Sequence, residues 1–278
     1  MTPCLNRAPL VIVFRGMRWS WVVALVLALA ACGGPGVQEA GTGTSPERTG
    51  RPVPEPVSSG PARRPVAEWL RVGGLAAPGL AAVRPPRLVV YADGLAIVDA
   101  AYELRLPPAE VETLVEALDH DLAGQPATAS PRPGSVRVYD MPTTVLGVDG
   151  GDGMREVYVP YLEAGAARYD AALVTARDRL AGLADRVASQ GRSYSADRVR
   201  LSAERVTAPA ATAKPLPEGV PLPAEAQGHS ASENHKDYKG SKAHAIARLI
   251  PGDGSWHVYR TSTGEPIALS WRYLLPHE

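Results

Sequence analysis

The strongest constraint on the fold is a set of short apolar segments between residues 88 and 106, followed directly by an amphipathic helix. Residues 88–91 and 95–98 flank Asp93-Gly94, a pair that supplies the positive-φ position of a tight hairpin turn. Residues 102–106 alternate apolar and charged side chains, which predicts a further strand with one solvated face. The stretch therefore predicts neighbouring antiparallel strands.

Two amphipathic helices are predicted in the same region. The first begins at Pro107-Pro108, since proline is tolerated in the first helical turn, and Gly124 is placed to end it. The second covers residues 167–190, and Gly191 lies just past its end. Each helix has one apolar face: Val111, Leu114, Val115, Leu118 and Leu122 in the first, and Leu173, Ala176, Leu180, Leu183, Ala184 and Val187 in the second.

The order of these elements predicts an α+β fold, with a mostly antiparallel sheet and two helices on one face, over residues 66–206. Residues 66–83 stay ambiguous, because Trp69, Leu70 and Val72 could form a short helix that two glycines and Pro78 would limit. The loop 149–153 is interpreted as a hairpin turn, since it lacks the alternating acidic positions and the later Glu of a calcium loop. Further strands are expected at residues 136–139, 144–148, 154–159 and 197–206.

The last part of the chain predicts a smaller unit. Residues 207–227 alternate proline with small residues and are expected to form an extended linker. Residues 228–278 predict a small C-terminal α+β unit, with a helix or, as the alternative, a strand from Ser241 to Ile250. Strands are expected at residues 256–260 and 267–273. Because such a unit is too small to be stable alone, we expect it to pack on the first domain.

The beginning of the chain predicts export. Arg15 and Arg18 precede the apolar run 19–31, which is shorter than the roughly 20 residues that span a bilayer. The run ends in Leu29-Ala30-Ala31-Cys32, which resembles the lipobox of bacterial lipoproteins. The resemblance implies that residues 1–31 are a signal peptide and that acyl chains on Cys32 hold the protein in the cell membrane, on its extracytoplasmic face.

Three further features of this region bear on the exported protein. A plain secretory signal and an uncleaved anchor helix are the alternatives to the lipobox, and Met17 could be the true start in place of Met1. Residues 32–65 are rich in Gly, Pro and Ser, which predicts a flexible tether. The other cysteine is Cys4, so the mature protein would have no disulfide and its fold must rest on its core.

Charge and motifs exclude several classes of function. Lys+Arg and Asp+Glu number 29 each, and three arginines precede Cys32, so the mature part would carry a net charge of −3 and no basic cluster typical of nucleic-acid binding. The chain contains no G-x-S-x-G elbow, no S-x-x-K pair, no H-E-x-x-H and no phosphate-binding glycine loop. No catalytic residue and no cofactor is therefore assigned.

Two groups of side chains near the C-terminus are candidates for a site. The first group is four histidines. Imidazoles are metal ligands, but these four have no one-turn spacing and no cysteine beside them, so a solvated loop is favoured over a metal site. The second group is four aromatic residues. They could form a binding platform, but the favoured interpretation is that they form the core of a small sheet. The histidines are His229, His235, His244 and His257, and the aromatic residues are Trp256, Tyr259, Trp271 and Tyr273.

Residues 86–206, with the hairpin Tyr91-Ala92-Asp93-Gly94, resemble a type of secreted actinobacterial lipoprotein that brings no known activity. The favoured interpretation is a lipid-anchored cell-envelope protein that acts as a binding or interaction module, with another protein or an envelope component as partner. An extracytoplasmic enzyme with a scattered active site is the second hypothesis. A metal-binding lipoprotein that uses the C-terminal histidine loop is the third.

Overall fold

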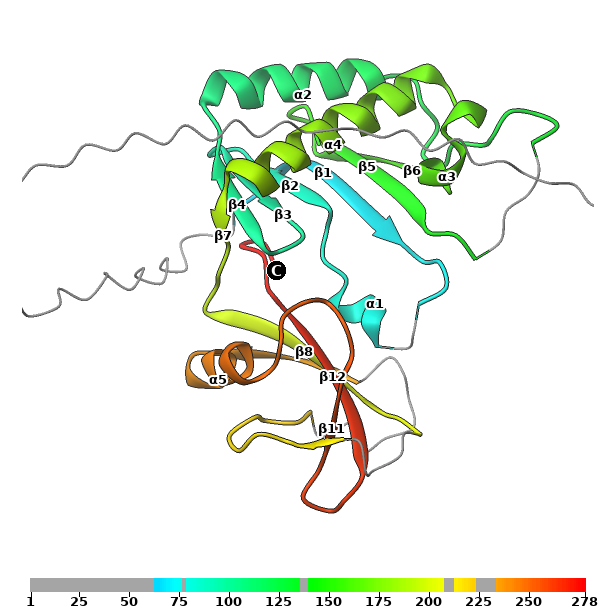
Figure 1. Cartoon of the computed structure of the whole chain (residues 1–278). Coiled ribbons are helices and arrows are strands. Elements are labelled where there is room, and N and C mark those ends of the chain that lie inside the picture. Colours follow the sequence, from blue (N-terminus) through cyan, green and yellow to red (C-terminus); the bar gives the residue numbers. More distant parts are fainter. Residues whose placement is uncertain (1–62, 77–78, 136–139, 208–212, 224–233) are drawn as a thin grey trace, which may run out of the picture. The chain divides into compact units, whose positions relative to one another are not determined.

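The structure, a computed structural model, describes residues 63–76, 79–135, 140–207, 213–223 and 234–278. Its helices and antiparallel strands confirm the α+β class (Figure 1). Seven strands form the first sheet in the order β6-β5-β1-β2-β3-β4-β7, and every neighbouring pair is antiparallel. These strands are β1 (Pro65–Val72), β2 (Leu88–Tyr91), β3 (Leu95–Val98), β4 (Tyr102–Arg105), β5 (Thr143–Asp149), β6 (Met154–Pro160) and β7 (Arg192–Ser193).

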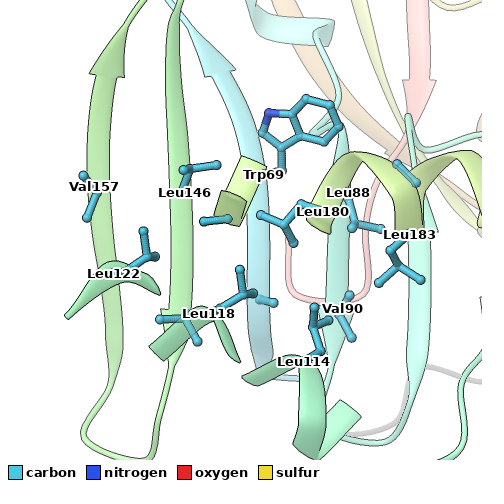
Figure 2. Packing of buried hydrophobic residues seen from close by; sticks show 14 of the residues in the cluster. Trp69, Leu88, Val90, Leu114, Leu118, Leu122, Leu146, Val157, Leu180 and Leu183 are labelled. Atoms are coloured by element: carbon cyan, nitrogen blue, oxygen red, sulfur yellow. The ribbon is translucent and has the colours of Figure 1, made fainter. Parts of the chain in front are cut away.

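Two long helices, α2 (Pro108–Leu122) and α4 (Ala171–Gln190), cover one face of the first sheet, as the sequence predicts (Figure 1). Asp170 caps α4, because its carboxylate accepts a hydrogen bond from Ala172 N–H at 2.8 Å. The leucines of both helices pack on the sheet in the main core, where Leu118 and Leu180 are fully buried (Figure 2). The short helix α1 (Leu80–Val83) connects β1 to β2, and the short helix α3 (Leu162–Gly165) with the 3-10 turn η1 (Ala166–Arg168) connects β6 to α4.

β1 differs from the short helix that Trp69, Leu70 and Val72 could form. It is a strand in the middle of the first sheet, paired with β2 on one side and β5 on the other. Ala67 and Trp69 point into the core beneath the helices. The strand is favoured because two partners supply backbone hydrogen bonds that a short helix in water would lack.

The second sheet has the order β10-β8-β12-β11-β9. β8 (Arg198–Arg205) was expected to close the first sheet; instead it pairs with β10 (His235–Lys239) and β12 (Pro266–Tyr273). The sheet is completed by β11 (His257–Arg260) and by the two-residue β9 (Lys214–Pro215), which pairs with β11 in parallel. The favoured helix near Ser241 is confirmed as α5 (Ser241–Leu249), and its Ile246 is buried against this sheet.

A third core lies on the face of the first sheet opposite the helices, where the segment after β12 packs. Tyr91 Oη lies 2.8 Å from His277 Nδ1, and Tyr194 donates a hydrogen bond to Leu274 O at 2.8 Å. Burial raises the pKa of Tyr91 and lowers the pKa of His277, so a neutral tyrosine can donate to a neutral imidazole. The small C-terminal unit thus packs on the larger one, as expected.

Two of the predicted segments lie in, or next to, residues that the structure does not describe. The strand expected at residues 136–139 lies outside the described residues. β1 begins at Pro65, inside the segment expected as a tether, and Arg63 and Arg64 just before it form ion pairs with Asp93 and Asp149. Within the described part of the chain, no helix is long and apolar enough to cross a membrane.

Candidate functional site

The candidate site is a hollow of about 310 Å³ at the edge of the first sheet. It is larger than the hollow of about 270 Å³ between α2 and α4 and that of about 140 Å³ beside β12. Three guanidinium groups gather around an apolar floor at the sheet edge, which is bordered by Leu95 from the face opposite the helices and by Leu104 from the helix-covered face. We call it the arginine pocket; its lining is Arg63, Leu95, Glu103, Leu104, Arg105, Gln190 and Arg192.

The β2–β3 hairpin builds one wall of the arginine pocket. Gly94 has φ +85°, and a Cβ there would collide with Leu106 O, so only glycine fits the turn. Asp93 receives a hydrogen bond from Leu95 N–H at 3.3 Å and ion pairs from Arg105 at 2.9 Å and Arg63 at 3.3 Å. The turn residue therefore holds two of the three arginines.

The electrostatics of Asp93 favour this arrangement. Partial burial raises the pKa of its carboxyl, but the hydrogen bonds from Arg105 and from Leu95 N–H and the charge of Arg63 outweigh the burial and lower the pKa below its ordinary value. Asp93 is therefore ionised at neutral pH. It holds Arg63 and Arg105 in place, and within the described part of the chain neither guanidinium pairs with a second carboxylate.

The opposite wall comes from the end of α4 and the edge of β4. β7 pairs only with Tyr102 and Glu103, so this short strand ends before Arg105. Arg192 on β7 donates to Glu103 Oε1 at 2.6 Å, and Gln190 is the last residue of α4. The pocket thus lies where the paired edge of the sheet ends and the helix stops.

The arginine pocket can bind an anionic group. Guanidinium groups donate in a fixed fork that matches the geometry of carboxylates and phosphates. The lining holds three guanidiniums and one carboxylate, that of Glu103, and the apolar floor can contact the uncharged part of a ligand. Nothing in the lining offers a nucleophile of the serine or cysteine type.

A second unusual group lies on the face of the first sheet opposite the helices. Glu68 projects there from β1; burial raises the pKa of its carboxyl to about 7, and the charges of Glu156 and Glu278 add to the rise. Gly147 on β5 is the register partner of both Glu68 and Glu156, so no side chain from β5 stands between them. Glu68 is therefore partly protonated near neutral pH.

The structure does not bring the three described histidines of this group, His235, His244 and His257, together. β8 and β12 lie between β10, which carries His235, and β11, which carries His257. His244 is exposed on α5, and His257 pairs with Asp253 at 2.8 Å. Among the described residues no three His, Cys, Asp or Glu side chains are grouped to hold a metal ion, while His229 lies outside them.

The remaining sequence candidates are placed as follows. Tyr259 and Trp271 are buried in the core of the second sheet, with Tyr273 packed against it, which confirms the interpretation as core for these three. The loop after Asp149 is a hairpin turn between β5 and β6, as predicted, and Asp149 accepts hydrogen bonds from its backbone. Cys32 lies outside the described residues.

The residues of the arginine pocket were not found from the sequence. Arg63 falls in the segment interpreted as a tether, and Asp93 carries a turn signal that does not reveal which arginines it would hold. Gln190 and Arg192 are close to Arg105 only through the pairing of β7 with β4, a contact between residues far apart in the chain. Comparison with protein-family models, with curated proteins and with solved structures found no match for this chain.

Proposed function

We propose that this chain is a lipid-anchored protein of the cell envelope, held at the extracytoplasmic face through Cys32, and that it acts as a binding module. The anchor is supported by the sequence alone, through the apolar run that ends in Leu29-Ala30-Ala31-Cys32. The binding role is supported by one structural observation, the arginine pocket. Its ligand is an anionic group, a carboxylate or a phosphate, carried by a protein or by another envelope component.

The arrangement of charges in the pocket supports a binding role. Arg105 and Arg192 are 57% and 75% exposed, yet each is oriented by a carboxylate, so their geometry is set before a ligand arrives. Preorganised donors lose less side-chain entropy on binding than free arginines would. Leu95 and Leu104 also line the pocket, so the ligand meets apolar atoms beside the charged groups.

Photo-crosslinking in the native envelope tests the binding role. Gln190 lines the arginine pocket, so a photo-reactive residue at this position lies in the pocket lining. It should crosslink to the anionic ligand that the pocket binds. The double variant Arg105→Gln, Arg192→Gln keeps polar, unbranched side chains and removes two charges; we expect the captured species to fall by about tenfold or more, since each charged hydrogen bond contributes about 1.5–3 kcal/mol.

The matched control is Arg248→Gln, which removes an exposed charge from α5 on the second sheet. This variant should capture the same species as the parent chain. Equal capture by the double variant and by the control would contradict the pocket as the binding site. The loss of the species in both would assign the effect to net charge and not to the pocket.

Glu68 favours a second candidate, an extracytoplasmic enzyme with a scattered site. A carboxyl with a pKa near 7 has the property that a general acid needs at neutral pH. A panel of glycan and ester model substrates, tested with the parent chain and with Glu68→Gln, examines this candidate. An activity that persists in Glu68→Gln would exclude Glu68 as its acid.

A further inference from the structure

Exposed apolar side chains gather at the end of the first sheet where β1 stops. Leu75 is 87% exposed, Met141 40% and Val72 39%. Isolated exposed apolar residues are common on proteins, but a leucine that is almost fully exposed beside two further apolar side chains marks an interaction surface. We call these three residues the apolar tip.

The backbone fixes the three residues of the apolar tip beside one another. Val72 is the register partner of Thr143 at the start of β5, two residues after Met141, and Figure 1 shows the two strand ends side by side. Leu75 N–H donates to Asp140 O at 3.0 Å. Gly74 has φ +75°, and a Cβ there would lie 2.8 Å from Pro142 N, so glycine allows the two loops to touch.

Two arginines, Arg71 and Arg84, lie beside the apolar tip. Arg71 precedes Val72, and its guanidinium lies 5.9 Å from the centre of the Trp69 ring. Arg84 donates to Gly73 O at 2.7 Å. Neither arginine takes part in an ion pair within the described residues, although Arg71 lies near the Asp99 carboxylate, which pairs with Arg87. Asp140, at the edge of the tip, contributes one opposite charge.

The segment between Cys32 and the described part of the chain is long enough for the apolar tip to reach the membrane. Residues 33–62 lie between Cys32 and the described part, and 30 residues can span at most about 100 Å. The chain enters the sheet at the start of β1 and the apolar tip lies at its other end, eight residues or about 25 Å away. An anchor at Cys32 therefore leaves ample chain for the tip to reach the same bilayer.

We propose that the apolar tip inserts into the surface of an anionic membrane, with Arg71 and Arg84 at the lipid phosphates. Apolar side chains beside arginines are the combination that binds the interface of an anionic bilayer, where each basic residue is attracted to the headgroups. The proposal rests on the envelope location proposed above. It gives the globular part a second contact with the membrane that needs no acyl chain.

Vesicle flotation tests the proposal with the exported chain from residue 33 onward, which lacks Cys32 and therefore any acyl chain. The probes are vesicles of neutral lipid and vesicles with about 30% anionic lipid. The chain should float with the anionic vesicles at low salt and be released at about 0.5 M salt, because screening removes the attraction of the arginines. Failure to float at low salt would overturn the proposal and leave a protein partner for the tip, whatever the state of Cys32.

Two variants separate insertion from general stickiness. Leu75→Ser should weaken the binding between about tenfold and 100-fold, because it removes the most exposed apolar side chain. Val258→Ser changes a side chain that is 36% exposed on β11, in the second sheet, and should bind as the parent does. Equal binding by Leu75→Ser and the parent would also overturn the proposal; unchanged thermal unfolding of both variants shows that they are folded.

Discussion

Glu68 is a residue whose ionised form lowers the stability of the folded state. Glu68 lies on β1, which pairs with β2 on one side and β5 on the other. Burial of its carboxyl, more than the charges of Glu156 and Glu278, makes ionisation unfavourable. The pKa is raised from an unfolded value of 4.5 to about 7 in the folded chain. The folded state therefore binds more protons than the unfolded state between these values, and Glu68 makes stability fall as pH rises through this window.

We predict that Glu68→Gln stabilises the protein at pH 8 and leaves it nearly unchanged at pH 4. The shift corresponds to at most about 3 kcal/mol at high pH, and solvent at the partly exposed carboxyl reduces it to about 1–2 kcal/mol. Urea unfolding of both chains across this pH range measures the difference. A difference that does not grow between pH 4.5 and 7 would show that Glu68 ionises normally in the folded state.

At the scale of elements, α2 shows what a sequence pattern can establish. Its apolar residues recur at helical spacing, and the structure buries Val111, Leu114, Leu118 and Leu122 as that spacing requires. Figure 2 shows the three leucines in the core. The helix lies over β1 and β5, so its apolar face is the cover of the main core. Removing one of these leucines should therefore leave a cavity rather than a new exposed surface.

We predict that Leu118→Ala lowers the free energy of unfolding by about 2–5 kcal/mol, because the side chain is fully buried and its neighbours on the sheet cannot fill the space. Glu116→Ala is the matched control, since Glu116 is exposed on the same helix and the change should stay within about 0.5 kcal/mol. Denaturant unfolding measures both. Similar midpoints for the two variants would mean that Leu118 does not support the core.

Helices and hairpins could be predicted from residues close together in the chain. The pairing of strands that are distant in the sequence was harder to predict. The Asp93-Gly94 hairpin, both long helices and the β5–β6 hairpin follow from residues close in the chain. β1 and β8 are different, because each joins a sheet through strands far away in the sequence. The arginine pocket depends on such a distant pairing, that of β7 with β4, and so could not be foreseen.

At the scale of the whole molecule, three contacts with the envelope are proposed: acyl chains on Cys32, the apolar tip, and the anionic ligand of the arginine pocket. They differ in strength and in chemistry. Two acyl chains give stable anchoring, with each buried methylene contributing about 0.8 kcal/mol, whereas three exposed side chains and two arginines give a weaker contact that salt disrupts. Salt therefore separates the anchor from the tip in one experiment.

We predict that Cys32→Ser in the full chain moves the protein from a membrane fraction that resists about 0.5 M salt to one that salt releases, because the thiol is the acceptor of the acyl chains and only the tip remains. Cys4→Ser is the matched control: it changes the chain's other cysteine, inside the segment that would be removed, and should leave the protein anchored. Fractionation with a labelled fatty acid measures both properties. If Cys32→Ser still incorporates label and resists salt, Cys32 is not the site of lipid attachment; if the parent chain itself incorporates no label, the protein is not a lipoprotein.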